Sequence, residues 1–368
     1  MKPICFLLSA CIFFACKNDK KTTTDDSSVK QVALSRPFEP FELEVYIDDF
    51  KIRNGPGIEH KEVARLKENT LVMYLGEKSR NTTEIKLRGV KLNTNWLKVK
   101  TKEGIEGWIY GGGIRAPKNG KEITKRTADF IPFVNFVDKK LGHDINMYRL
   151  EWNSARTSSA FADAYLSGEE AQQKFNETLA SKVQIDNTDK LIDMSWIDFF
   201  LPGFQNSLVA EGTTFNIFKD FKVMYAKAKE TEGTEDDNFI TFQFHANELD
   251  SVEYYYKSWF MQTWDYGGHS LLGQGKHFDL LNEANELLAK SSLFEKPILN
   301  IKNEILNDIS AEHITYWESK DKILAEMKKI IDADFHFLAA VDKILIKTRY
   351  EQFKKPAANK IEVNNRAF

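Results

Sequence analysis

The spacing of apolar residues changes near residue 117 and divides the chain into two kinds of structure. Before it, short runs rich in strand-forming residues alternate with turn residues, at positions 43–47, 71–75, 96–100 and 107–110. After the segment 116–120, which holds a proline and a glycine, apolar residues recur at helical spacing. The pattern therefore predicts a small all-β barrel at residues 39–117, followed by a larger, mainly α-helical domain at residues 118–368.

The helical pattern is clearest near the C-terminus, where apolar residues share one face: Ile323, Met327, Ile330, Ile331, Leu338, Val341 and Leu345. Residues 239–245 are ambiguous, because they alternate like a strand while Phe239 and Phe242 also share a helical face. Thr234 with Asp237 three residues later resembles a capping box, with aspartate in place of glutamate. We therefore expect a helix in this stretch.

The N-terminus carries an apolar run at residues 3–15, directly after Lys2. A membrane-spanning helix needs about 20 apolar residues, so this run is too short to cross a bilayer. It ends at Ala15-Cys16, and a small residue before a cysteine in this place resembles the bacterial lipobox. The resemblance implies that residues 1–15 are a lipoprotein signal peptide and that Cys16 receives lipid. The alternative is an ordinary signal peptide that ends near a cysteine.

Cysteine usage limits the chemistry of the rest of the chain. The three cysteines are Cys5, Cys11 and Cys16, so a chain cut before Cys16 keeps only that one. A disulfide framework, a thiolate nucleophile and a cysteine metal site are thereby excluded downstream. Residues 16–38 are polar and poor in aromatic residues, which predicts a flexible tether. We expect a protein held on a bacterial membrane through acylated Cys16, facing the periplasm or exposed on the cell surface.

Five short motifs in residues 50–109 resemble those of bacterial SH3 domains. They are FKIRNGPG at 50–57, the segment 60–66, LVMYL at 71–75, WLKV at 96–99 and GIEGWI at 104–109. The resemblance implies a small, strongly bent SH3-like barrel. Between Leu75 and Trp96 the chain carries a long polar insertion, which we expect to form an enlarged loop.

Members of this family commonly attach to cell-wall peptidoglycan or accompany enzymes that cut it, so the resemblance implies a module that binds wall material or a protein. Trp96, Tyr110 and His60 are the candidate ligand-binding residues, because an aromatic ring can stack on a ligand while its polar tip stays in water. The alternative for Trp96 and Tyr110 is a place in the barrel core, where we also expect Trp108.

A glycine-rich break at residues 264–279 is the most unusual segment of the helical part. Asp265, His269 and His277, joined by His245, form a candidate polar cluster that could do acid–base work or hold a metal. Their spacing lacks the compact pattern of a zinc site, so we assign no catalytic residue, metal or cofactor. The alternative is a structural corner between helices with polar caps.

These features predict a lipid-anchored cell-envelope protein. Its SH3-like domain would bind peptidoglycan peptide or an envelope protein, and its helical domain would be a non-catalytic interaction domain. The alternatives are a metal-dependent cell-wall hydrolase that uses the C-terminal domain, and an immunity or inhibitor lipoprotein. A formal net charge of −3 with no clustered basic residues argues against nucleic acid as a partner.

Overall fold

A computed structural model describes most of the chain after residue 37. The described residues are 38–115, 117, 136–183, 185, 194, 196–209, 214–248, 256–262 and 267–365. Contacts separate residues 1–38 from a compact unit of residues 39–368. The predicted signal peptide, Cys16 and almost all of the predicted tether lie outside the described residues. In the described part, no helix combines the length and the apolar character that crossing a membrane requires.

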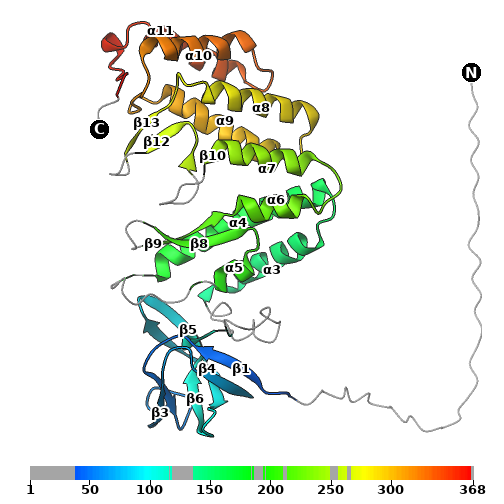
Figure 1. The fold of residues 1–368 in the computed structure, drawn as a ribbon, viewed down its shortest axis with the longest axis vertical. Helices are drawn as coiled ribbons and strands as arrows, with labels where there is room; N and C mark the ends of the chain where they lie inside the picture. The colour runs from blue at the N-terminus through cyan, green and yellow to red at the C-terminus, as the bar shows by residue number, and fades with distance from the viewer. Residues whose placement is uncertain are drawn as a thin grey trace, which may run out of the picture. The chain divides into compact units, whose positions relative to one another are not determined.

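The N-terminal part of this unit is one antiparallel sheet of seven strands (Figure 1). The strands are β1 (Phe41–Val45), β2 (Phe50–Arg53), β3 (Glu62–Leu66), β4 (Leu71–Leu87), β5 (Val90–Lys100), β6 (Glu106–Tyr110) and β7 (Ile114–Arg115). Their order is β3-β2-β6-β5-β4-β1-β7, so the sheet is a curled half-barrel with β3 and β7 at its two ends. The predicted strands are confirmed, but the sheet is more open than the closed barrel that we expected.

The core of the sheet follows the alternation of side chains along each strand. Ile52 of β2, Val99 of β5 and Ile109 of β6 are fully buried, whereas Lys51 and Lys98 beside them are not. Most apolar positions of the five sequence motifs therefore fill the inner face of the sheet, whereas Val63 and Ile105 are exposed.

The segment between Leu75 and Trp96 is not the enlarged loop that we expected. It continues β4 and β5 as a long hairpin, whose pairing runs to Leu87 opposite Val90. The hairpin closes at Arg88 and Gly89, which both have positive φ, of 45° and 86°, as a tight two-residue hairpin turn requires. The insertion pairs with itself because its apolar residues alternate, and Val90 and Leu92 are buried.

The rest of the described chain is mainly helical, as predicted. Its α-helices are α3 (Lys139–Ser154), α4 (Ser158–Lys182), α5 (Trp196–Phe200), α6 (Phe221–Ala228), α7 (Glu235–Ala246), α8 (Lys276–Lys290), α9 (Glu295–Ser310), α10 (Lys320–Ala333) and α11 (Ala340–Phe353). Three two-stranded ribbons, which we did not predict, pair β8 (Phe204–Val209) with β9 (Thr214–Lys219), β10 (Asn247–Glu248) with β11 (Tyr256–Lys257), and β12 (Phe260–Gln262) with β13 (Gly268–Ser270).

Helix α7 confirms the helix predicted for residues 239–245, but its start differs from the prediction. The Thr234 side chain makes no cap hydrogen bond, so the predicted capping box with Asp237 is wrong. Buried Asp236 anchors the start of the helix. Its carboxylate accepts hydrogen bonds from the Ser158 hydroxyl at 2.7 Å and the Thr231 hydroxyl at 2.6 Å. The start of α7 is thereby tied to the start of α4.

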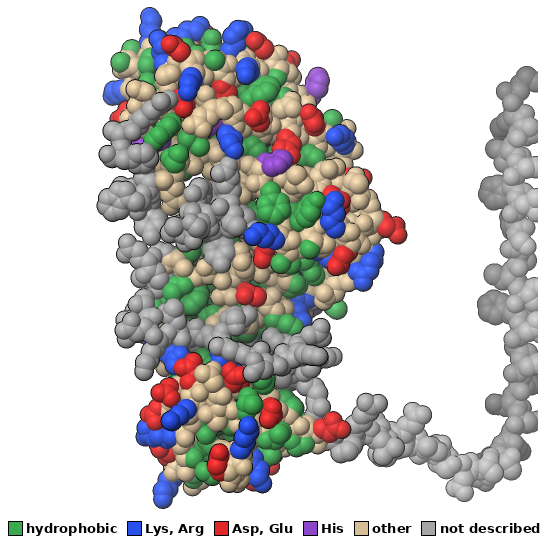
Figure 2. Space-filling model, in the orientation of Figure 1, with side chains coloured by type: hydrophobic (Ala, Val, Ile, Leu, Met, Phe, Trp, Pro, Cys, Tyr) green, Lys and Arg blue, Asp and Glu red, His purple; other side chains and the backbone are tan. Residues whose placement is uncertain are grey.

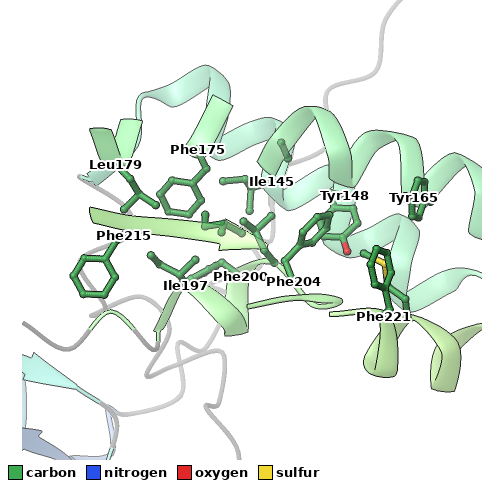
Figure 3. Close-up of a cluster of buried hydrophobic side chains, with 14 of the residues drawn as sticks. Ile145, Tyr148, Tyr165, Phe175, Leu179, Ile197, Phe200, Phe204, Phe215 and Phe221 are labelled. Atoms are coloured by element: carbon green, nitrogen blue, oxygen red, sulfur yellow. The ribbon is translucent and has the colours of Figure 1, made fainter. Parts of the chain in front are cut away.

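Helices α3 and α4 pack against the ribbon β8–β9 (Figure 3). The side chains that meet there include Ile145, Tyr148, Phe175, Leu179, Phe204 and Phe215. Gly168 of α4 permits the close approach, since a Cβ at this position would lie 2.7 Å from the Tyr148 ring and 2.9 Å from the Phe204 ring.

Three aromatic rings join this layer to the C-terminal helices. Phe239 of α7 meets the edge of Tyr165 of α4 at a centroid distance of 5.0 Å and stacks on Phe294, at the start of α9, at 4.1 Å. All three rings are buried. Helices α4, α7 and α9 therefore share one core, which both the burial of these rings and their mutual contacts stabilise.

This packing predicts a large difference between two identical substitutions. Ile305 of α9 is 1 % exposed and Ile344 of α11 is 65 % exposed. We expect Ile305→Ala to lower the free energy of unfolding by about 2–5 kcal/mol, because it removes buried methyl groups and leaves a cavity. Ile344→Ala, the matched control, should change it by less than about 0.5 kcal/mol. Urea titrations followed by far-UV circular dichroism measure both, and equal effects would contradict the assigned core.

Candidate functional site

Trp96 and Tyr110, two of the predicted ligand-binding residues, lie in the core of the sheet. Their exposed fractions are 3 % and 2 %, and their rings meet edge to face at 5.6 Å. The Trp96 indole N–H donates to Thr83 Oγ1 at 2.9 Å, and the Tyr110 hydroxyl donates to the Leu92 carbonyl at 2.6 Å. Burial also raises the pKa of Tyr110 well above its ordinary value. Neither ring offers a face to a ligand, so this structure is not compatible with the groove role expected for them.

Trp108, which we expected in the core, is the more accessible tryptophan of the sheet. Ile109 points inward and is fully buried, so the preceding residue of β6 points to the other face and Trp108 is only half-buried. There it lies opposite Arg53 of β2 and Lys98 of β5. Strand alternation counted from Ile109 would have predicted this exposure.

The third predicted residue, His60, lies at the end of the turn that joins β2 to β3. The Arg53 guanidinium donates to the His60 carbonyl at 2.6 Å, and the His60 imidazole covers Gly55. The His60 side chain is 40 % exposed, and Ile58 in the same turn is also exposed. Arg53 thus connects this turn to Trp108, which lies opposite it, and we call Trp108, Arg53, Ile58 and His60 the β2–β6 corner.

The glycine-rich segment encloses a carboxylate that belongs to the chain itself. Glu326 of α10 is buried and accepts N–H hydrogen bonds from Gly273 at 2.5 Å, Gly275 at 2.9 Å and Phe278 at 3.0 Å. Gly273 and Gly275 have φ of +104° and +93°, which a residue with a side chain rarely adopts. Backbone N–H groups arranged in this way form an anion-binding concavity, and here its anion is internal.

His277, at the start of α8, is fully enclosed beside this loop. Its Nε2 lies 2.7 Å from Asp308 Oδ2, an oxygen that also accepts the Ser270 hydroxyl at 2.5 Å. Its Nδ1 lies 4.0 Å from a carboxylate oxygen of Glu326 and has no hydrogen-bond partner among the described residues. Ser270, His277 and Asp308 therefore form a buried polar cluster that joins β13, α8 and α9.

The other predicted members of the polar cluster do not meet His277. His269 Nδ1 lies 2.7 Å from the Thr315 hydroxyl, and exposed His245 lies 2.9 Å from the Glu283 carboxylate. Asp265 lies outside the described residues. Within the described ranges, no group of three or more His, Cys, Asp or Glu side chains is arranged to hold a metal ion. The described geometry favours a structural corner for this segment.

Described residues of the helical part line hollows, of which two bear on function. One, of about 350 Å³, is lined by Phe244, His245, Lys276, Asp279, Leu280 and Glu283. The other, of about 250 Å³, is lined mainly by residues of α4, β9, α7, β11 and α9. No sequence motif pointed to the second hollow, because its residues come from distant parts of the chain. Figure 2 shows acidic and basic side chains interspersed over the face in view, without a broad patch of one sign.

The comparisons with known proteins agree with the five strand motifs. The family model of the bacterial SH3 domain matches residues 48–115, a stretch that includes strands β2 to β7 and none of the helices α3 to α11. No curated protein and no solved structure matches the chain.

The enclosed carboxylate leads to a prediction about stability. Glu326→Gln turns one acceptor oxygen into an NH2 group that faces backbone N–H donors, so we expect the free energy of unfolding to fall by about 3 kcal/mol. Asp332→Asn, on the exposed side of the same helix, is the control and should cost at most about 1 kcal/mol. Denaturant titration measures both. In Glu326→Gln, the remaining oxygen can still accept from Gly273 and Gly275, so the amide of Phe278 loses its acceptor and should exchange faster with deuterium; unchanged exchange would contradict this acceptor.

Proposed function

We propose that this chain is a lipid-anchored protein of the bacterial cell envelope whose SH3 domain binds peptidoglycan peptide. The match to the bacterial SH3 domain supports a role in binding cell-wall material, because such domains often bind peptidoglycan or proteins. It is also consistent with a cell-envelope or extracellular location. Under this proposal residues 39–117 are the binding module, and residues 118–368 are a helical interaction domain without catalytic function.

The observation that carries the proposal is the β2–β6 corner within a bacterial SH3 domain. Trp108 is half-buried, with Arg53 and Lys98 opposite it on the neighbouring strands. An anchored indole can stack on a sugar or a peptide plane, and Arg53 can attract a carboxylate of an acidic peptide, whereas Lys98 is paired with Glu77 at 2.6 Å. His60 and Ile58 extend this surface along the turn. We therefore place the binding surface at this corner and not at Trp96 or Tyr110.

A binding role is also favoured over the metal-dependent hydrolase. Of the histidines in the predicted cluster, His277 is the one held between two carboxylates, and its exposed fraction is 0 %. A hydrolytic metal needs an open coordination position for water and access for substrate. Neither is offered by a side chain whose surroundings are closed by β13, α8, α9 and α10.

The proposed surface can be tested on purified peptidoglycan. We expect Trp108→Ala to reduce binding about tenfold in a sedimentation assay, since a tryptophan at the centre of an interface commonly contributes more than 1 kcal/mol. Trp317→Ala is the matched control, because Trp317 is also partly buried but lies in the helical part. It should leave binding unchanged. Equal binding by Trp108→Ala and the wild type, with unchanged circular dichroism, would overturn the assignment of this surface.

The proposed anchor is tested by a second pair of variants. We expect Cys16→Ser to move the protein from the membrane fraction to the soluble fraction, because the variant has no sulfur to receive lipid. Cys11→Ser is the control, since Cys11 belongs to the proposed signal peptide and its loss should leave the protein on the membrane. Mass spectrometry of the wild-type N-terminal peptide should show acyl chains on Cys16. An unmodified thiol there, or a retained leader, would refute the anchor.

A further inference from the structure

The hollow of about 250 Å³ in the helical part has the features of a ligand site. It lies among helices α4, α7 and α9, which the contacting rings of Tyr165, Phe239 and Phe294 hold in one core. The side chains that line it include Glu169, Lys219, Gln243, Asn247, Lys257 and Glu304. The helical walls of this hollow are therefore fixed by packing.

Polar amides line this hollow next to apolar side chains. Gln243 is 3 % exposed and Asn247 is 7 % exposed, and the Asn247 amide donates to Gln243 Oε1 at 3.2 Å. Phe221 and Ile301, which are buried, supply the apolar surface beside them. Burying amides costs free energy unless they find hydrogen-bond partners, and here the Asn247 amide also donates to the Gln243 carbonyl at 3.0 Å, so these polar groups are held in fixed positions beside the hollow. The lining is thus mainly polar and charged, with an apolar floor of a few side chains, which suits a small polar ligand better than an apolar one.

Two ion pairs from different walls contribute to the lining. Lys219 of β9 pairs with Glu169 of α4, and Lys257 of β11 pairs with Glu304 of α9 at 2.7 Å. Each ammonium also lies over an aromatic ring, Lys219 over Tyr165 at 5.1 Å and Lys257 over Trp259 at 5.5 Å. The aromatic rings hold the cations in place.

These two ion pairs can bind a ligand that carries both a positive and a negative group. All four charged side chains are partly exposed, and ion pairs of this kind contribute little net stability. A lysine or glutamate of these pairs can therefore also bind a ligand at little cost in free energy. A ligand carboxylate can join a lysine while a ligand ammonium joins a glutamate, and the net charge of the site then stays unchanged. A ligand with one charge leaves one member of a pair without such compensation.

We propose that this hollow binds a small zwitterion that carries an ammonium and a carboxylate group, such as a free amino acid or the end of a short peptide. Its volume lies below the roughly 300–1,000 Å³ of pockets for drug-sized ligands, which restricts it to a ligand of this size. The proposal goes beyond the proposed function and does not rest on it, because the β2–β6 corner contributes no residue to the hollow.

Isothermal titration calorimetry of the full chain in detergent tests this proposal with four probes. Alanine and alanyl-alanine carry both charges, N-acetyl-alanyl-alanine amide carries neither, and glucose is an uncharged polar control. We expect at least one zwitterion to bind and the blocked dipeptide to bind at least about tenfold more weakly. Tighter binding of alanine would indicate a free amino acid, and tighter binding of the dipeptide would indicate a peptide end. Absence of binding by both zwitterions, or equal binding by the blocked dipeptide or glucose, would overturn the proposal.

Two charge variants locate the binding in the hollow. Lys257→Met and Glu304→Gln keep the size of partly exposed side chains and should each weaken zwitterion binding about tenfold, with unchanged thermal unfolding. Lys328→Met removes a lysine from an exposed pair on α10 and is the matched control, which should bind as the wild type does. Wild-type affinity in both Lys257→Met and Glu304→Gln would show that the hollow is not the binding site. These outcomes leave peptidoglycan binding by the SH3 domain unaffected, so the two proposals can fail independently.

Discussion

A carboxylate that is buried among apolar helices needs hydrogen-bond donors, and this requirement determines how the C-terminal part of the chain is connected. Glu326 meets it by accepting N–H groups from Gly273, Gly275 and Phe278. The backbone can present these groups together only where two residues adopt positive φ, which explains both glycines. The backbone then continues from Gly275 directly into α8, which places His277 beside Asp308. One buried charge thereby fixes the connection between a ribbon and three helices.

The same requirement explains other junctions of the helical part. Buried Asp236 links the start of α7 to Ser158 at the start of α4. Buried Arg349 of α11 donates to the Ile309 carbonyl at the end of α9, and the Tyr316 hydroxyl donates to that carbonyl as well. Burial raises the pKa of Tyr316 to about 12, so its hydroxyl stays a donor at neutral pH. Polar groups thus fix the ends of helices, while aromatic packing joins α4, α7 and α9 in one core.

Local patterns predicted the secondary structure better than they predicted which side chains are accessible. Alternation identified the strands of the SH3 domain, and it would have placed Trp108 outward from its neighbour Ile109. It could not have placed Trp96, because Trp96 and Leu97 are adjacent and both buried. Opposite them the pairing of β4 shifts register between Lys78 and Thr82, which interrupts the alternation. Such a register shift depends on how the whole sheet curls, so it is hard to predict from the sequence of one strand.

The two candidate sites of the helical part show why sequence signals and accessible sites differ. The glycine-rich segment attracts notice because close approach of the backbone to an anion requires unusual residues, and the structure does place an anion there. That anion is Glu326, fifty-one residues after Gly275, so the chemistry was predictable while the source of the charge was not. Gln243 and Lys257 each look like ordinary polar residues in the sequence, since an amide or a lysine alone requires no special backbone. Only the packing of α4, α7 and α9 brings them to one hollow, where their joint chemistry becomes that of a recognition site.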